Sequence, residues 1–312
     1  MKNKILIIAG PTATGKTQLS IELAKQSNAE IINFDSLLFY QQLNIGTAKP
    51  SLEELNSVPH HMINIQSISE PLNAADYYQR TLPIIQEIHS KNRPIILVGG
   101  SGFYLQTLLK GMYQSPSTPQ EILMKSENIY RDKGITPFRE FLYENDIESY
   151  QQYHENDHYR IRRAVEHFWA NKTKFSSVRA EMQTRNISPP QKYKWNIRYN
   201  YIDLNKEDHL EIISKRTNKM ITDGLENEVR SLLSQGFTGA EKPLMSIGYK
   251  EMQAYLNEEI KSIEDCVERI NISTRQLAKS QRTWFKKQEK FEYDILNQYD
   301  KVYNDSIEFL RD

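Results

Sequence analysis

The segment from Gly10 to Thr17 has the residue types and the spacing of a phosphate-binding loop. It reads GPTATGKT, which fits the pattern GxxxxGK[ST], with an apolar strand expected before it and a helix after it. Glycines let the backbone curl so that its N–H groups point inward at phosphate oxygens, and the N-terminus of the following helix adds positive charge. We therefore predict that this loop binds a diphosphate or a triphosphate.

The side chains of the loop indicate how the phosphates would be held. Lys16 supplies a full positive charge for the terminal phosphate, and the Thr17 hydroxyl can ligate a Mg²⁺ ion that bridges the phosphates. We therefore expect Mg²⁺ as the cofactor and Thr17 as its protein ligand. The residues expected to bind the phosphates are Gly10, Thr12, Ala13, Thr14, Gly15, Lys16 and Thr17.

Asp35 stands at the end of a second apolar segment, 30–34. In open α/β sheets the ligand crevice lies outside the carboxyl ends of the strands. A carboxylate at this position can therefore accept a proton from an acceptor nucleophile, or orient it through a hydrogen bond. Because Asp is also a favoured residue at helix N-caps, a capping role is an equal alternative on the sequence alone.

A third apolar segment, 94–98, ends in the sequence GGSG, which contains Ser101. Such a sequence forms either a simple tight turn or a place where the backbone approaches a ligand closely, with the Ser101 hydroxyl facing it. No aspartate follows Val98, where many nucleotide hydrolases carry one that organises Mg²⁺ and water. That difference favours a transferase of the nucleoside-kinase type over a motor protein or a switch GTPase.

Strands and helices that alternate along the chain must position these residues. The strands are expected at 4–9, 30–34, 94–98 and 196–204, and the helices at 16–26, 73–91, 103–109, 209–222, 225–235, 246–256 and 259–290. The strand expected at 4–9 is continuously apolar rather than alternating, which is typical of a parallel sheet covered on both faces. We predict an α/β fold, a P-loop nucleotide-triphosphatase-like parallel sheet with flanking helices.

The middle of the chain has a different character. Between the proline-rich segments 115–119 and 188–190 the sequence is polar, helical in pattern and rich in tyrosine, histidine and charge. We interpret residues 115–190 as an inserted helical lobe, and residues 1–114 and 191–312 as the two parts of a discontinuous catalytic core.

Basic residues are concentrated in two segments, although the whole chain carries 40 basic and 40 acidic residues. The segment 150–199 has ten basic and four acidic residues, a net charge of +6, and the segment 271–290 has six and one, a net charge of +5. Such segments are typical of contacts with a nucleic-acid backbone, and two solvated helix faces are an equal alternative.

Helical spacing aligns some of these basic residues. Arg160 and Arg163 share one face, and so do Arg275, Lys279 and Arg282. Two aromatic residues, 284 and 285, follow the second group. Arginine and aromatic side chains together can hold phosphates and stack unpaired bases. Taken singly, however, we expect Trp284 and Phe285 to belong to the core, as most aromatic residues at helical spacing do.

Composition excludes several classes of protein. The longest apolar runs are strand-sized, far from the ~20 apolar residues that a membrane span needs, so we expect no membrane contact. Cys266 is the only cysteine, which rules out a disulfide within the chain and a cysteine-based zinc finger, and we expect it to pack in the core. The N-terminus shows no signal peptide, so we expect a cytoplasmic protein, and a monomer.

These motifs also occur in a particular order. After the phosphate loop and Asp35 come NIGTAKP, PHH, GGSGFY, RIRR, IGY and TRQLAK, which begin at residues 44, 59, 99, 160, 247 and 274. In this order they resemble the tRNA dimethylallyltransferase family, also called tRNA isopentenyltransferases, in its bacterial form. The resemblance spans nearly the whole chain, and the blocks at 46–50 and 274–279 are far more specific than the phosphate loop.

The resemblance implies a reaction and a role for each catalytic residue. A dimethylallyl group would pass from dimethylallyl diphosphate to N6 of the adenosine adjacent to the anticodon, position 37 of tRNA, and diphosphate would leave. Asp35 would act as a general base or orient the amine, Ser101 would lie near that amine, and Arg216 would neutralise the leaving diphosphate. The partners would be the anticodon stem-loop and dimethylallyl diphosphate. From the resemblance and the basic segments, the expected tRNA contacts are Asp35, Ser36, Leu37, Leu38, Ser101, Tyr159, Arg160, Ile161, Arg162, Arg163, Arg275, Gln276 and Lys279.

Three positions depart from the usual pattern of the family. Ser101 replaces a threonine but keeps the hydroxyl, Leu38 replaces a glutamine, and Asn218 replaces an aspartate two residues after Arg216. Two other classes of function compete. A small-molecule or nucleoside kinase that uses ATP would share the loop and Asp35 but would not need the two basic segments. A non-catalytic RNA-binding protein would explain those segments but not the intact phosphate loop.

Overall fold

The structure is a computed structural model that describes residues 3–112, 118–185 and 187–311. It divides into two compact units, a discontinuous one formed by Met1–Gly111 and Ser188–Asp312 and a smaller one formed by Met112–Ile187. The boundaries expected from the sequence, 114/115 and 190/191, lie within three residues of these divisions. Of the proline-rich segment 115–119, residues 115–117 lie outside the described residues.

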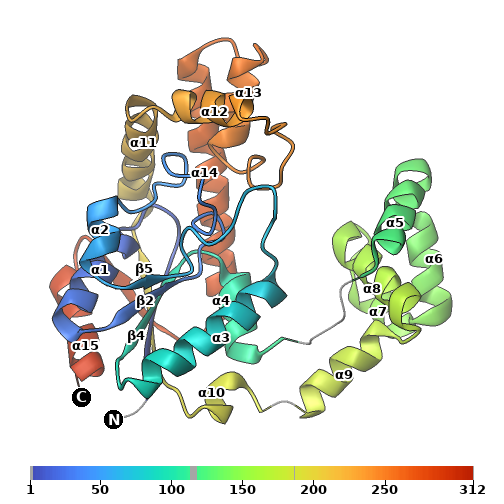
Figure 1. Cartoon of the computed structure of the whole chain (residues 1–312), viewed down its shortest axis with the longest axis horizontal. Coiled ribbons are helices and arrows are strands. Elements are labelled where there is room, and N and C mark those ends of the chain that lie inside the picture. Colours follow the sequence, from blue (N-terminus) through green and yellow to red (C-terminus); the bar gives the residue numbers. More distant parts are fainter. Residues whose placement is uncertain (1–2, 113–117, 186, 312) are drawn as a thin grey trace. The chain divides into compact units, whose positions relative to one another are not determined.

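A six-stranded parallel sheet forms the centre of the larger unit (Figure 1). In spatial order its strands are β3 (His60–His61), β2 (Glu30–Asn33), β4 (Ile95–Gly99), β1 (Lys4–Ala9), β5 (Asn196–Asp203) and β6 (Phe291–Asp294). The four strands expected from apolar runs are present, and the predicted α/β class with a parallel sheet is confirmed.

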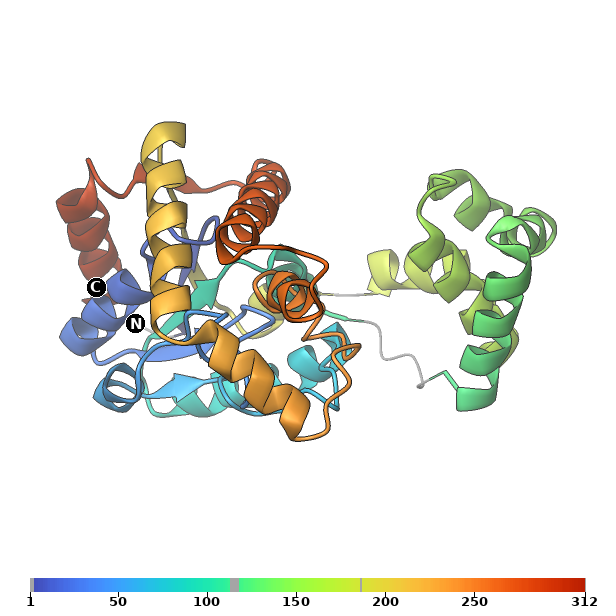
Figure 2. The ribbon, with the colours of Figure 1, turned by 90° about the horizontal axis from the view of Figure 1, so that it is seen from above.

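Helices cover both faces of the sheet, which explains why every residue of the central strand β1 is buried. The helices of this unit are α1 (Lys16–Ser27), α2 (Leu52–Ser57), α3 (Ala74–Ser90), α4 (Gly102–Lys110), α10 (Pro189–Lys192), α11 (Lys206–Thr222), α12 (Leu225–Ser234), α13 (Tyr249–Leu256), α14 (Ile263–Phe285) and α15 (Tyr299–Arg311). Ile5 and Ile7 face a core shared with α3 and α4, whereas Leu6 and Ile8 face a second core shared with α1 and α15. Figure 2 shows α15 beside α1.

The carboxyl ends of four neighbouring strands meet at one edge of the sheet. The phosphate loop follows β1, Asp35 comes shortly after β2, Ser101 follows β4, and Asp203 is the last residue of β5. Because all six strands are parallel, these four segments lie along the same edge, where open α/β sheets bind their ligands.

The C-terminal part differs from the sequence-based expectation. The long helix expected over 259–290 begins at Ile263 and ends at Phe285, and the chain then forms β6 and α15, neither of which was predicted. The strand β6 has only four residues and no apolar run, so it carries too little pattern to be detected. Two core predictions are confirmed, because Phe285 and Cys266 are both buried; burial raises the pKa of the Cys266 thiol to about 11. The same prediction for Trp284 is wrong, because its side chain is 37% exposed on the neighbouring position of α14.

The smaller unit consists of helices around a core of its own, as expected for an inserted helical lobe. The helices are α5 (Gln120–Lys133), α6 (Thr136–Asn145), α7 (Ile147–Gln152), α8 (His158–Asn171) and α9 (Phe175–Arg185). Phe138, Leu142, Ile161 and Val165 are buried between them. Across the described residues of both units, no helix has the length and apolar character needed to cross a membrane.

Replacing Phe285 with alanine should destabilise the larger unit strongly. The Phe285 side chain is 1% exposed and its ring centroid lies 5.7 Å from that of Tyr201, so the change leaves a cavity that neighbouring side chains cannot fill. We expect a loss of about 3–5 kcal/mol in the free energy of unfolding, measured by urea denaturation. Phe291→Ala is the matched control, because Phe291 is 54% exposed, and a comparable loss there would contradict the assignment.

Candidate functional site

The backbone of the phosphate loop has conformations that its glycines make accessible. Gly15 has φ 75°, in the left-handed region, and Ala13 has φ 63°. At Gly10, a Cβ atom would lie 2.0 Å from the carbonyl oxygen of Ile202 on the neighbouring strand, so no larger residue fits. The loop therefore requires glycine at both ends of the motif for reasons of geometry.

Lys16 turns back onto the loop that carries it. Its ammonium donates a hydrogen bond to the carbonyl of Pro11 and lies 3.4 Å from the Thr14 hydroxyl, which itself donates to the same carbonyl at 3.0 Å. Burial lowers the pKa of Lys16 to about 8, and the negative charge of Asp35 partly opposes that shift. An anion bound in the loop would attract the Lys16 ammonium and raise its pKa again.

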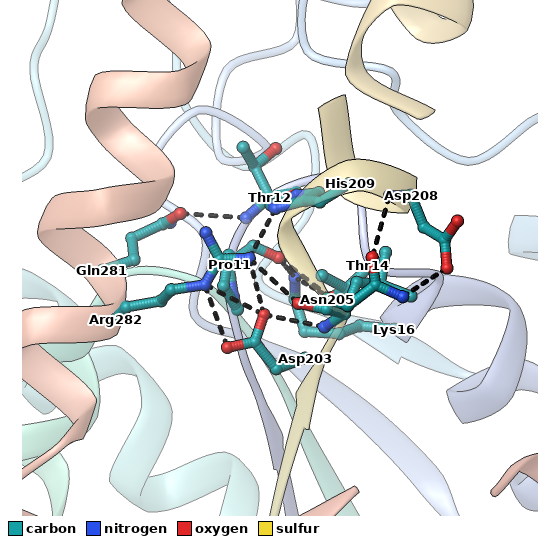
Figure 3. A network of polar contacts seen from close by, with 11 residues as sticks. Pro11, Thr12, Thr14, Lys16, Asp203, Asn205, Asp208, His209, Gln281 and Arg282 are labelled. Carbon is teal, nitrogen blue, oxygen red and sulfur yellow. Dashed lines mark hydrogen bonds and ion pairs between the residues drawn. The ribbon is translucent and has the colours of Figure 1, made fainter. Parts of the chain in front are cut away.

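Gln281 of α14 ties two of the strand-end segments together, and Figure 3 shows its contact with Thr12. Its side-chain oxygen accepts from the Thr12 backbone N–H at 2.9 Å, and its side-chain nitrogen donates to the Gly100 carbonyl at 2.9 Å. One amide thus fixes the phosphate loop against the turn that precedes Ser101. Sequence reasoning included Gln281 in no site, because nothing local indicates this contact.

A second group of polar contacts supports the loop from α11 (Figure 3). His209 donates from Nε2 to the Thr12 carbonyl at 2.8 Å, while its Nδ1 accepts from Arg282 at 2.6 Å. This arrangement needs the neutral imidazole, and burial lowers the pKa of His209 in agreement with it. Arg282 also binds Asp203 through Nε and Nη2, at 3.1 and 2.8 Å from Oδ1.

These contacts correct the expectation for Arg282, which helical spacing grouped with Arg275 and Lys279 on one face. Its guanidinium pairs with a carboxylate at the edge of the sheet. The contribution of Asp203 was also missed, although it ends a strand predicted from the sequence and so lies where ligand-facing side chains are expected. His209 carried no signal beyond its residue type.

Asp35 and Ser101 are brought close to each other, as expected from their strand ends. One carboxylate oxygen of Asp35 accepts from the Leu37 N–H at 3.1 Å, and in the described part of the chain the other oxygen has no hydrogen-bond partner. Ser101 accepts from the Ser36 N–H at 3.2 Å and lies 3.4 Å from the Ser36 hydroxyl. Asp35 therefore holds a local turn and still presents one oxygen. No helix begins there, since the next described helix is α2 at Leu52, so the helix N-cap alternative is wrong.

Arg216, which also belongs to α11, contacts the phosphate loop at Thr12. Its Nη1 donates to the Thr12 hydroxyl at 2.9 Å, and its Nη2 donates to the Thr47 carbonyl at 3.1 Å. Burial lowers the pKa of this guanidinium, and the Asp35 carboxylate opposes the shift. A half-buried cation beside the phosphate loop can stabilise negative charge that develops there.

A cavity of about 210 Å³ joins these groups. Polar side chains form one part of its lining, namely Thr12, Asp35, Ser36, Thr47, Ser101, Arg216, Thr217, Thr274 and Gln281. Apolar side chains form another part, namely Leu37, Ile213, Met220, Ile247, Ile270 and Leu277. The cavity can therefore accept a ligand that has a strongly anionic end and a small hydrocarbon end.

The expected tRNA contacts are unequal in exposure. On α8, Tyr159 is 69% exposed, whereas Ile161 is 1% exposed and belongs to the core of the smaller unit, so its side chain does not reach the surface. The three arginines of α8 pair with acids of that unit, Arg160 with Asp157, Arg162 with Glu127 and Arg163 with Glu166.

On the larger unit the expected contacts lie on α14 and on the turn after β2. Gln276 and Lys279 are exposed on α14, and Arg275 pairs with Glu268 at 2.6 Å. Leu38 is half-buried in the turn that Asp35 begins.

The environment of Thr17 is compatible with the predicted Mg²⁺ ion. Thr17 lies in the first turn of α1, and its hydroxyl has no hydrogen-bond partner among the described residues, so it is available as a ligand. Over the same residues, no group of three or more histidine, cysteine, aspartate or glutamate side chains could hold a metal ion. A Mg²⁺ ion here would take most of its ligands from phosphate oxygens and water, as this ion commonly does.

Comparisons with known proteins agree on one family. The model of the IPP transferase family matches residues 38–288. The chain is 36% identical over 286 residues to a tRNA dimethylallyltransferase of Geobacter sulfurreducens, which covers 92% of this chain and 90% of that protein. It is 34% identical over 312 residues to a tRNA dimethylallyltransferase of Caldanaerobacter subterraneus, with 98% and 95% covered.

Solved structures give the same result. The tRNA isopentenylpyrophosphate transferase of Bacillus halodurans is similar with a TM-score of 0.69 and 28% identity, over 99% of this chain and 97% of that one. A eukaryotic dimethylallyltransferase that acts on tRNA is similar with a TM-score of 0.81 and 29% identity, over 96% of this chain and 76% of that one.

The affinity for inorganic diphosphate should fall as the pH rises above about 8. The free protein loses the Lys16 proton around pH 8, and a bound anion raises that pKa, so binding above it requires uptake of a proton. The affinity should then decrease by up to about tenfold per pH unit. Calorimetric titrations at several pH values measure this dependence.

Lys16→Arg is the matched control, because arginine keeps its charge at high pH. Diphosphate itself also titrates in this pH range, but it does so equally in both experiments. The difference between the two pH profiles of affinity therefore reports the titration of Lys16. Identical pH profiles for the two proteins would contradict the assignment.

Proposed function

The chain belongs to the IPP transferase family, and we propose that it transfers a dimethylallyl group from dimethylallyl diphosphate to N6 of adenosine 37 in tRNA. The observation that carries this proposal is one cavity in which Thr12 of the phosphate loop and Arg216 lie beside an apolar wall and the carboxylate of Asp35. The cavity thus offers a place for the diphosphate, the hydrocarbon and the attacking amine. A kinase that uses ATP is not favoured, because the relatives are named as dimethylallyltransferases.

The donor would bind with its diphosphate on the phosphate loop. As the bond between the allylic carbon and the diphosphate oxygen breaks, the electron pair stays on oxygen and negative charge grows there. The ammonium of Lys16, the loop N–H groups and the Arg216 guanidinium, which already contacts the loop at Thr12, would stabilise that charge. A Mg²⁺ ion held by Thr17 would supply further positive charge at the phosphate oxygens.

The acceptor amine would approach the carbon from the side of Asp35. A new bond forms between N6 and the allylic carbon, and the amine must lose one proton. The carboxylate oxygen of Asp35 that does not hold the Leu37 N–H would orient the amine and accept that proton. The Ser101 hydroxyl, which lines the same cavity, would fix the adenine edge.

The adenine must leave the anticodon-loop stack to enter this cavity, at a cost of a few kcal/mol. Phosphate contacts elsewhere on the tRNA would offset that cost. On the larger unit these contacts would come from Arg275, Gln276 and Lys279, and from the turn at 35–38. On the smaller unit they would come from the exposed side chains of α8, Tyr159, Arg160 and Arg163. Because the acceptor is tRNA, we place the reaction in the cytoplasm.

Asp35→Asn should lower the rate of prenyl transfer by about 10²–10⁴-fold while the protein stays folded. Asparagine keeps the oxygen that accepts from the Leu37 N–H, so the turn survives, but it removes the basic oxygen. The assay incubates the protein with undermodified tRNA, dimethylallyl diphosphate and Mg²⁺ and measures the modified nucleoside by mass. Asp35→Ala should lose the turn as well, and Asp223→Asn, a surface change on the same unit, serves as the control.

Two results would count against this part of the proposal. Normal turnover by Asp35→Ala would remove the carboxylate from the reaction. Loss of activity that follows loss of the folded state in both variants would leave Asp35 only its role in the turn. A different result would favour a kinase that uses ATP. In that case the wild-type protein would make no prenylated nucleoside and would bind ATP more tightly than dimethylallyl diphosphate.

Lys279→Ala should weaken tRNA binding and flatten its salt dependence by about one unit of slope on a log–log plot. The Lys279 side chain is exposed on α14 and can neutralise one phosphate. Affinity for dimethylallyl diphosphate should stay unchanged. Lys301→Ala, an exposed lysine of α15, is the control and should keep the wild-type slope; equal slopes in all three proteins would exclude Lys279 from the interface.

A further inference from the structure

A single carboxylate organises the segment between β2 and α2. Glu228 of α12 accepts hydrogen bonds from three consecutive backbone N–H groups, those of residues 44, 45 and 46. The donor–acceptor distances are 3.1 Å at Asn44, 2.9 Å at the closer contact of Ile45 and 3.2 Å at Gly46. A run of N–H groups that converges on one anion is a strong, charge-assisted arrangement.

The hydroxyl of Tyr249 completes the surroundings of this carboxylate. It donates to Oε1 of Glu228 at 2.6 Å. Its ring also lies against the backbone of Gly46, where a Cβ atom would be only 2.5 Å from the ring. Four donors therefore converge on one side chain, and the close approach requires a glycine at position 46.

The other end of the segment is fixed independently. The ammonium of Lys49 donates to the Tyr40 carbonyl at 2.7 Å, to the Asn64 side chain at 2.6 Å and to the Asn44 side chain at 3.0 Å. The 44–49 segment is thus held at both ends, by an anion and by a cation, and its middle has little freedom.

The middle of the segment contacts the candidate site. The Thr47 carbonyl accepts from Arg216 at 3.1 Å, and Gly46 and Thr47 both line the cavity, whereas Glu228 does not. The position of this carbonyl therefore decides in which direction the planar guanidinium presents its remaining N–H groups.

We propose that Glu228 is a positioning residue for the transfer reaction, which holds the 44–46 backbone so that Thr47 fixes Arg216 toward the departing diphosphate. The inference rests on the proposed function, in which Arg216 stabilises the leaving group. A carboxylate is needed because all four groups that face it are donors. In Glu228→Gln one oxygen becomes an NH₂ group, which is itself a donor and cannot accept hydrogen bonds from the groups that face it.

A double-mutant cycle tests whether Glu228 acts through Arg216. The four proteins are wild type, Glu228→Gln, Arg216→Ala and the double variant. Glu228→Gln alone should lower kcat for prenyl transfer by roughly tenfold to a hundredfold, with tRNA affinity unchanged. In the Arg216→Ala background the same change should have almost no further effect, because the group that it positions is gone. Glu226→Gln is the matched control, since Glu226 of the same helix pairs with Arg230 at the surface.

The affinity for inorganic diphosphate, measured on the same four proteins, gives a second cycle that needs no turnover. If wild type makes no prenylated tRNA but the binding cycle is non-additive, the proposed function fails and the positioning role stands. If Glu228→Gln lowers binding and kcat by the same factor in both backgrounds, Glu228 only supports the fold and the inference is overturned. Unchanged binding in Arg216→Ala overturns it as well.

Tyr249→Phe provides a milder variant should Glu228→Gln not fold. It removes one of the four donors and leaves the carboxylate and the ring in place. It should lower kcat in the same direction by a smaller factor, and that loss should also disappear in the Arg216→Ala background. A loss that persists there contradicts the proposal.

Discussion

The polar groups of a single residue, Thr12, hold the site together. Its N–H donates to Gln281, its carbonyl accepts from His209 and its hydroxyl accepts from Arg216. His209 and Arg216 are seven residues apart on α11, which places them two turns apart on one face of the helix. The phosphate loop is consequently fixed from α11 and α14 at once, and any shift of either helix would change the shape of the anion site.

The charged side chains around this loop leave a net positive charge that could bind an anionic ligand. Lys16, Arg216 and Arg282 bring three positive charges close to the loop, and Asp35 and Asp203 bring two negative ones. Arg282 and Asp203 largely neutralise each other through their two-pronged contact, and Arg282 also keeps His209 in its neutral form. Lys16 and Arg216 are left facing one carboxylate, so a bound diphosphate would compensate a local excess of positive charge.

Local pattern was sufficient where the chemistry belongs to one segment, and insufficient where it depends on tertiary contact. The phosphate loop, Asp35 and Ser101 each follow a detectable apolar strand, so the strand-end rule places them together. Glu228 lies on a helix that was predicted, but its backbone partners are about 180 residues away and no periodicity encodes them. The contacts of Gln281 and His209 with Thr12 are at least as distant in the sequence. The pairing of Arg282 shows that residue type alone does not distinguish a paired arginine from a free one.

That distinction matters most for the basic segments. A net charge counts arginines without regard to their partners. Binding of a phosphate, however, depends on which ion pairs and packing contacts each guanidinium must lose. Arg160 is 61% exposed in its pair with Asp157, and exposed pairs contribute at most about 1 kcal/mol, so a phosphate can replace the carboxylate at little cost. Arg162 is only 19% exposed and lies over the ring of Tyr130, so withdrawing it would disturb packing as well as charge. The segment therefore offers fewer contacts to an RNA than its charge implies, and the exposed arginines are the ones that can exchange partners.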